Sequence, residues 1–144
     1  MRSGHPLTAM LAAMLWLGLA GTGFTQPLWI QIDLSDQRMQ VMEGDALVHE
    51  WPVSTARAGK RTPVGDFTPY LLKRRHFSSL YNNAPMPYSI FFKGNYAIHG
   101  TDQIDRLGSP ASAGCVRLHP DHAAALFEKV LAAGKDMTRV VIRE

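Results

Sequence analysis

Only one segment of this chain has the periodicity of an amphipathic helix, and the other patterned segments are short and alternate with a period of two. Apolar residues recur at helical spacing between Ala124 and Leu131. Pro120 occupies the first helical position, where its fixed φ angle suits a helix start, and Gly134 follows the last turn. We therefore predict a helix over about residues 120–133 and a mainly β fold elsewhere.

The strands of this fold are expected to be short and closely spaced. Their alternating or β-branched character predicts strands at 29–34, 39–42, 47–53, 67–72, 88–92, 95–99 and 138–143. Polar and glycine turns separate them, as in an all-β sandwich or barrel. The 144 residues suffice for one domain, and no repeat or low-complexity tract suggests a second.

A long loop between two of these strands is a candidate functional element. Residues 54–65 are rich in small residues, glycine and proline and show no periodicity. Loops of about 12 residues are uncommon in compact domains and often carry function.

The first 26 residues have the layout of a secretory signal peptide. Arg2 supplies the positive end, and an apolar run, LTAMLAAMLWLGLA, covers residues 7–20. Cleavage is expected after Ala20 or just before Gln26, with an uncleaved anchor as the alternative. The folded domain then covers residues 27–144, and the protein is predicted to be exported to the periplasm or cell envelope.

The charge balance argues against a nucleic-acid-binding protein. The chain has 15 basic and 12 acidic residues; removing Arg2, the only charged residue of the first 26, leaves 14 against 12. The longest basic run is residues 73–75, which is too short for a binding stripe and more typical of a solvated strand end. A monomer is the default expectation.

The single cysteine, Cys115, is either a buried inert residue or a reactive thiol, and its odd count in an exported chain leaves both open. A thiol is a good nucleophile only as a thiolate, so it needs a base or a positive charge nearby. His99 ends a predicted strand and is a candidate base. The amides of Gly114 and Cys115 are candidate donors to an oxyanion, and Arg117 would share a face with Cys115 in an extended segment.

These residues resemble a known family. The pattern of His-Gly at 99–100, a gap, and S-A-G-C-V-R-L at 112–118 is similar to that of the bacterial L,D-transpeptidase catalytic domain. Further similarity lies in the opening hairpin at 33–39, in 51–55, in the T-P-V-G-D-F turn at 62–67 and in Met86-Pro87-Tyr88. The resemblance covers about residues 28–143.

The resemblance implies a β-sandwich-like or mixed-sheet fold and a cofactor-free acyl transfer on peptidoglycan stem peptides. Cys115 would attack the L–D bond between residues three and four of a tetrapeptide stem, with His99 as its base. The thioester would pass to an amine, giving a 3–3 cross-link or an anchored envelope protein, or to water, which trims the stem. The resemblance assigns supporting roles in the oxyanion hole, ring orientation and substrate pocket to Gly114, Ser112, Arg117, Tyr88, Gly100 and Thr101.

One position departs from the family pattern. The family usually has histidine directly before the motif glycine, and here that residue is Ala113. We expect activity to survive because Cys115 and His99 are both present. Two alternatives follow from the departure: a shift towards another acceptor or hydrolysis, and a non-catalytic wall-binding module that keeps only the cleft.

Two further patterns have plainer interpretations. His119 and His122 lie near Cys115, but no known ligand spacing is present, so exposed histidines at a helix start are predicted rather than a metal site. His49 and His76 are expected to face solvent or pack structurally. The aromatic residues would suit a sugar-stacking surface but are predicted to belong to the core: Trp29, Trp51, Phe67 and Phe127.

Overall fold

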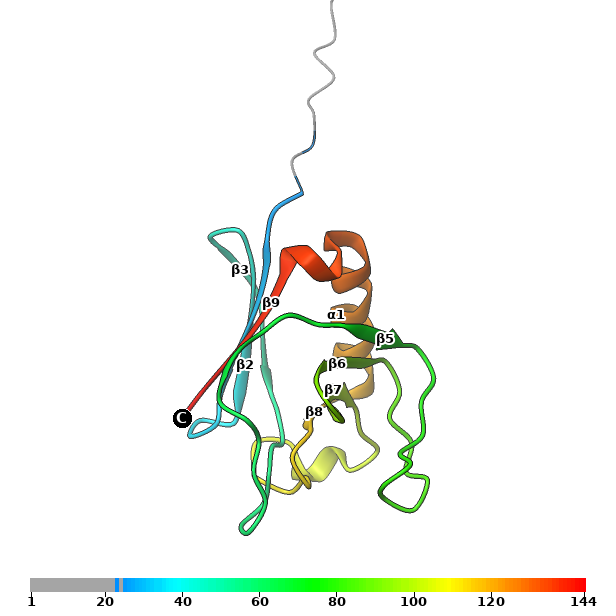
Figure 1. Cartoon of the computed structure of the whole chain (residues 1–144). Coiled ribbons are helices and arrows are strands. Elements are labelled where there is room, and N and C mark those ends of the chain that lie inside the picture. The colour runs from blue at the N-terminus through cyan, green and yellow to red at the C-terminus, as the bar shows by residue number, and fades with distance from the viewer. Residues whose placement is uncertain (1–22, 24) are drawn as a thin grey trace, which may run out of the picture.

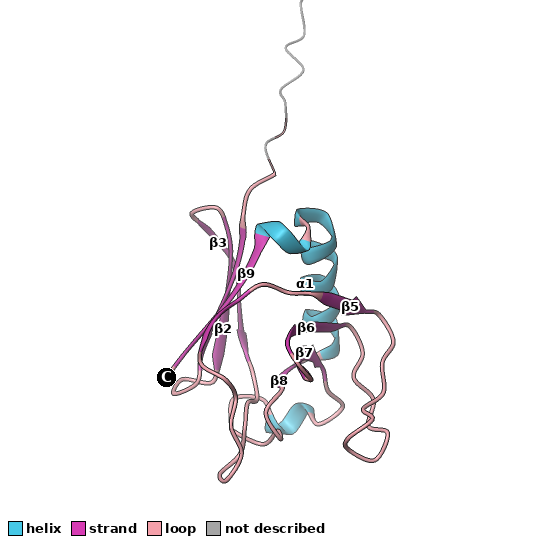
Figure 2. Ribbon diagram, viewed as in Figure 1, coloured by secondary structure: helices cyan, strands magenta, loops and turns pink. Residues whose placement is uncertain are grey.

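The computed structural model describes Gly23 and residues 25–144, so the predicted signal segment lies almost wholly outside the described residues. Two sheets and one long helix make up the domain (Figures 1 and 2). The strands are β1 (Leu28–Asp33), β2 (Arg38–Glu43), β3 (Ala46–Pro52), β4 (Gly65–Phe67), β5 (Leu71–Lys73), β6 (Ser89–Lys93), β7 (Tyr96–Gly100), β8 (Val116–Leu118) and β9 (Thr138–Arg143). The helices are α1 (Pro120–Ala133) and the 3₁₀ turns η1 (Ile104–Arg106) and η2 (Lys135–Met137).

Both sheets are mixed. The five-stranded sheet has the order β3-β2-β1-β9-β4, and the four-stranded sheet has the order β5-β6-β7-β8. The central pair β1–β9 is parallel and joins the two ends of the domain, and the pair β7–β8 is also parallel. A parallel pair requires a crossover, which for β7 and β8 is the segment that contains η1.

The five-stranded sheet shows the alternation that the sequence predicts. In β1, Leu28, Ile30 and Ile32 are buried, and the residues between them are exposed. Met39 and Val41 of β2 and Val140 and Ile142 of β9 join them in one core. The sheet therefore buries one face against the rest of the domain and presents the other to solvent.

The four-stranded sheet is buried more completely. Residues 89–92 of β6 and 97–100 of β7 are all buried, because one side of the sheet packs on the common core and α1 while the other faces a second cluster of Met86, Phe91 and Ala97. Helix α1 contributes Ala123, Leu126, Phe127 and Val130 to the common core. Its end is set by Gly134, whose φ of 90° a residue with a side chain rarely adopts.

Most of the predicted elements are confirmed within one or two residues, and the helix bounds and the last strand agree fully. The predicted strand at 67–72 is wrong. The chain there forms two short strands, β4 and β5, which belong to different sheets. Pro69 lies between them, and because proline has no N–H group it interrupts a ladder.

Of the four aromatic residues predicted to lie in the core, three do and one lies at the surface. Trp51 and Phe127 are buried, and Phe67 packs against the same core, as predicted. Trp29 is 37% exposed and lies on the solvent face of β1, so its predicted place in the core is wrong. His49 stacks on Trp51 with ring centroids 4.4 Å apart, and His76 meets the ring of Phe91 edge-on at 5.2 Å.

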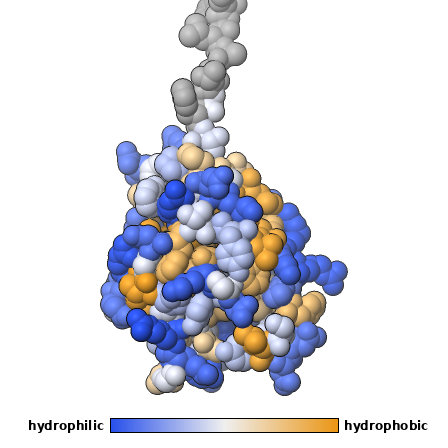
Figure 3. All heavy atoms as spheres, in the orientation of Figure 1, coloured by the Kyte–Doolittle hydropathy of each residue, from blue (hydrophilic) through white to orange (hydrophobic). Residues whose placement is uncertain are grey.

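On the face seen in Figure 3, hydrophilic side chains predominate and hydrophobic ones form groups between them. The large aliphatic side chains lie mainly inside: Ile30, Met39, Ile98 and Leu126 are almost fully buried. None of the described helices is long and apolar enough to cross a membrane.

Candidate active site

The parallel pair β7–β8 brings the two central candidate residues to one place. In its register, Ile98 lies opposite Val116 and His99 lies opposite Arg117. Cys115 directly precedes β8, two residues before Arg117, so its side chain falls on the same side of the sheet as those of Arg117 and His99. Strand pairing thus brings together two segments that are 16 residues apart in sequence.

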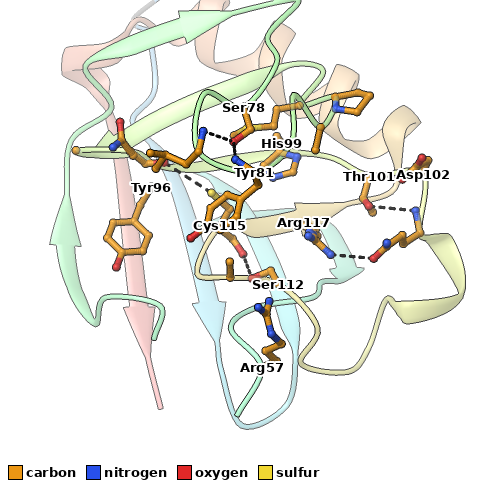
Figure 4. A pocket seen from close by; sticks show the side chains of 18 of the residues that line it. Arg57, Ser78, Tyr81, Tyr96, His99, Thr101, Asp102, Ser112, Cys115 and Arg117 are labelled. Atoms are coloured by element: carbon orange, nitrogen blue, oxygen red, sulfur yellow. Dashed lines mark hydrogen bonds between the residues drawn. The ribbon is translucent and has the colours of Figure 1, made fainter. Parts of the chain in front are cut away.

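A cavity of about 500 Å³ opens on this side of the sheet. Its size lies within the usual range for ligand pockets. Figure 4 shows Cys115 and His99 among the side chains that surround it. The lining residues come from four segments: Arg57 of the first long loop, residues 78–86 of the second, 93–103 around β7, and 112–117 around β8.

His99 is held as a neutral base. Its side chain is buried, with 6% exposed, and Nδ1 lies 2.7 Å from the carbonyl oxygen of Gly100. A carbonyl accepts only, so Nδ1 carries the proton and Nε2 keeps its lone pair. Burial lowers the pKa of His99 to about 4; the nearby charges of Arg117 and His76 act in the same direction, and the Gly100 bond opposes them.

Cys115 is partly buried, and its thiol is held in the neutral form. Burial raises its pKa, while a hydrogen bond from the Ala97 backbone and the charge of Arg117 oppose that rise. Sγ also lies 3.7 Å from the carbonyl oxygen of Asn95. The site therefore pairs a neutral thiol with a neutral imidazole. Proton transfer must then accompany nucleophilic attack.

The turn before Cys115 is fixed by its own hydrogen bonds. The Gly114 amide donates to Ser112 Oγ at 3.0 Å, and that hydroxyl donates to the Cys115 carbonyl at 2.7 Å. Gly114 has a φ of 141°, and a Cβ there would lie 2.6 Å from Cε1 of Tyr96. The Gly114 amide is bonded to Ser112 Oγ and Gly114 does not line the cavity, so its role as an oxyanion donor stays a prediction. The Cys115 amide is the other candidate donor to the oxyanion.

Some of the other predicted site residues line the cavity and some do not. Ser112, Thr101 and Arg117 line the cavity. Gly100 does not, but its carbonyl orients His99. Tyr88, predicted to help line the donor pocket, does not line this cavity, and its ring packs edge-on against Phe127 at 5.7 Å.

Several lining residues were missed by the sequence reasoning. Tyr81 and Tyr96 supply aromatic surface, and Arg57 and Lys93 supply positive charge. Arg57 had a signal, since it lies in the loop 54–65 that was singled out for its length. Tyr96 had none, because an aromatic residue at a strand start is common in any sheet.

The helix-start histidines lie apart from the cavity. His119 Nδ1 accepts a bond from the Asp121 amide at 3.1 Å and so caps α1. His122 stacks on Trp51 with ring centroids 4.7 Å apart. In the described part of the chain no three potential ligands among His, Cys, Asp and Glu converge.

Comparison with known proteins gives the same picture of the fold. A solved L,D-transpeptidase from Xylanimonas cellulosilytica superposes with a TM-score of 0.70 at 27% identity, covering 84% of this chain and 62% of that one. L,D-transpeptidase 3 from Mycobacterium tuberculosis, solved in complex with a faropenem-derived adduct, superposes with a TM-score of 0.71 at 18% identity over 83% and 61% of the two chains. The mainly β, mixed-sheet fold is therefore the one predicted.

Sequence comparison leads to the family itself. YkuD of Bacillus licheniformis, provisionally named an L,D-transpeptidase, is 28% identical over 99 residues, which cover 66% of this chain and 55% of that protein. The chain thus spans about half the length of the curated relatives it matches. The family model for the L,D-transpeptidase catalytic domain, YkuD, matches residues 27–142. Because that match covers nearly all the described chain, the protein belongs to the L,D-transpeptidase catalytic domain family.

Proposed function

We propose that this protein is a peptidoglycan L,D-transpeptidase that works through a thioester on Cys115. The observation that carries the proposal is the paired site itself. Cys115 lines the same cavity as His99, and the 2.7 Å bond from Nδ1 to the Gly100 carbonyl leaves Nε2 as a free base. A nucleophile, a base and a group that orients the base are the arrangement that acyl transfer requires.

The proposed reaction has two stages. In the first, Sγ attacks the carbonyl carbon of residue three of a tetrapeptide stem while His99 Nε2 takes the thiol proton. The oxyanion forms beside the Cys115 amide, and collapse breaks the C–N bond as His99 returns its proton to the leaving D-amino acid. In the second, an amine attacks the thioester, gives its proton to His99 and releases the thiol.

The neutral resting states of His99 and Cys115 suit these reaction steps. A base with a pKa near 4 stays unprotonated at neutral pH and is ready to accept a proton. The thiol has a raised pKa, and the positive charge of Arg117 would stabilise the thiolate as it forms.

A covalent inhibitor offers a second line of support. The M. tuberculosis enzyme of the same fold carries a faropenem-derived adduct in its structure. We propose that β-lactams of this kind acylate Cys115 here, because their strained carbonyl would meet the same nucleophile and base.

The acceptor and the compartment belong to the proposal as well. Peptidoglycan lies outside the cytoplasm, so we propose that residues 1–26 direct export and that the enzyme acts in the periplasm or cell envelope. An amine of a second stem would give a 3–3 cross-link, and an amine of an envelope protein would give anchoring. Water in place of the amine would give trimming.

The test is product analysis by mass spectrometry. The mature domain is incubated with disaccharide-tetrapeptide stems beside a Cys115→Ala control. We expect dimers linked through residue three, absent from the control. Tripeptide stems alone indicate hydrolysis, and the absence of any Cys115-dependent product supports a non-catalytic wall-binding module instead.

A further inference from the structure

The cavity beside Cys115 has an excess of positive charge. Among the described residues, three basic side chains line it, Arg57, Lys93 and Arg117, against the one carboxylate of Asp102. Figure 4 shows Asp102 on the far side of Arg117 from Arg57. Basic side chains therefore outnumber carboxylates by three to one among the described residues that line the cavity.

Arg57 is held in place by its backbone. Its amide donates to the Ser112 carbonyl at 2.9 Å, and the preceding residue, Ala56, forms an isolated β-bridge with Ser112. Thr62 Oγ1 accepts from the Ala56 amide at 3.0 Å and donates to the Gly114 carbonyl at 2.8 Å. The loop of Arg57 is thus bonded directly to the turn that carries Cys115, and Figure 4 shows the Arg57 side chain rising towards Ser112.

The guanidinium of Arg57 has no bonded partner in the part of the chain that the structure describes. Three other arginines of the described chain form ion pairs with carboxylates: Arg38 with Glu50, Arg74 with Glu128, and Arg143 with Asp66. Among the described residues, Arg57 has no hydrogen-bond or ion-pair partner for its side chain, and Arg117 bonds only to the neutral Gln103, at 3.0 Å.

Two guanidinium groups that bond to no carboxylate in the described chain lie beside one nucleophile, which favours an anion between them. Burial lowers the pKa of Arg117, and the charge of Arg57 lowers it further, while the charges of Cys115 and Asp102 oppose the shift. The two guanidinium groups therefore repel each other. A carboxylate would remove that repulsion and would satisfy the planar donors of an arginine with two parallel bonds. Ala113 presents only a methyl group at this point, which leaves room for it.

We infer that Arg57, together with Arg117, binds a carboxylate of the peptide substrate next to the scissile bond. The inference rests on the proposed function and adds the group that this end of the site recognises. Two sources have this chemistry. One is the α-carboxylate of the leaving fourth residue, which lies one residue beyond the attacked carbonyl, and the other is a side-chain carboxylate on residue three.

The test measures binding without turnover, in the Cys115→Ala chain. Dissociation constants are measured by calorimetry for a tetrapeptide stem, for the same peptide with a C-terminal amide, and for a peptide whose third residue lacks a carboxylate. Each is compared in Arg57→Gln, in Arg57→Lys and in the matched control Arg61→Gln. Arg61 is exposed on the same loop and does not line the cavity.

We expect Arg57→Gln to weaken binding of the tetrapeptide about tenfold, as for loss of a charge-assisted hydrogen bond, and Arg57→Lys to recover part of the loss. The peptide that has lost the recognised carboxylate should bind Arg57→Gln and the parent equally, which identifies the source. Equal losses for all three peptides, a loss no larger than in Arg61→Gln, or no binding to any chain overturns the inference.

The inference and the proposed function fail separately. Arg57-dependent binding with no turnover by the unaltered enzyme contradicts the proposed function and keeps the inference. If the unaltered enzyme turns over and the Arg57→Gln chain binds the peptide as well as its parent, the proposed function stands and the inference is contradicted.

Discussion

The two sheets of this protein differ in whether their charged and titratable side chains are bonded to carboxylates. The five-stranded sheet carries two exposed ion pairs, Arg38 of β2 with Glu50 of β3 and Arg143 of β9 with Asp66 of β4, each at 2.8 Å. On the four-stranded sheet, His99 and Arg117 share one side of a parallel pair beside Cys115, with no carboxylate bonded to either in the described chain. Pairing satisfies charges, whereas the second sheet leaves them available to a ligand.

The difference has an energetic side. Exposed ion pairs such as those of the first sheet contribute little to the free energy of unfolding, because water screens them. In the second sheet, burial shifts the pKa values of His99, Cys115 and Arg117 away from their ordinary values and towards the neutral forms. Such shifts concentrate at functional sites. We expect substitutions in the two sheets to separate activity from stability.

The largest effect is expected for the base. His99→Gln keeps a polar side chain of similar size but removes Nε2, so the rate of Cys115 acylation should fall about 10²- to 10⁴-fold. The measurement is the rate of adduct formation by mass spectrometry. The matched control is His49→Gln, on β3 of the other sheet, where we expect an unchanged rate. Equal rates in the two variants would remove His99 from the mechanism.

The buried histidine should also make stability depend on pH. The pKa of His99 is about 4 in the folded chain and about 6.5 when it is exposed, so the unfolded chain alone binds a proton between these values. The contribution of His99 to the free energy of unfolding should therefore be complete above pH 6.5. It should fall by about 3 kcal/mol as the pH drops to 4.

Denaturant titrations of the parent and of His99→Gln from pH 7 to pH 4 measure this dependence. His49, whose pKa burial also lowers, remains in both chains and cancels. The variant should lose less stability than the parent over this range. Parallel curves would show that His99 is not held neutral.

A smaller effect is expected for the bond between the two loops. Thr62→Val removes the buried hydroxyl that links Ala56 to Gly114, which should cost about 1–3 kcal/mol of unfolding free energy and also slow acylation. The control is Thr138→Val at the start of β9, where a buried hydroxyl donates to the Gly134 carbonyl at 2.8 Å. Thr138→Val should lose comparable stability and keep its acylation rate. If the acylation rate falls in both variants, the slower acylation of Thr62→Val follows from lost stability alone.

The smallest effect is expected on the solvent face of the five-stranded sheet. Arg143→Gln breaks the exposed ion pair with Asp66, and we expect neither the acylation rate nor the denaturant midpoint to change by much. A large loss of either would mean that this sheet contributes to the site through its charges, which would end the division between the two sheets.

Strand length explains much of what was predictable in the fold. The strands of the five-stranded sheet alternate between core and solvent, so β1, β2 and β9 were predicted almost to the residue. In the four-stranded sheet, β8 is three residues long and gives no period to detect. The split between β4 and β5 was missed because the sequence shows Pro69 but not that the flanking strands join different sheets.

The candidate site was predicted where chemistry is local in sequence and missed where it depends on packing. Cys115, Arg117 and Ser112 lie within one short segment, and His99 is marked by the glycine that follows. Tyr88 looked suitable by resemblance, but its place depends on a φ of 55° and on Phe127, 39 residues further on. The neutral state of the site depends on burial, which no motif reports.

The most direct test of the account is to trap the acyl-enzyme. A tetrapeptide stem without an acceptor amine is mixed with the mature domain, quenched in acid at early times, digested and analysed by mass spectrometry. We predict a tripeptidyl mass on the fragment that contains Cys115, slowed in His99→Gln and absent from Cys115→Ala. A stem that is turned over with no mass on Cys115, or with the mass on another residue, would contradict the account.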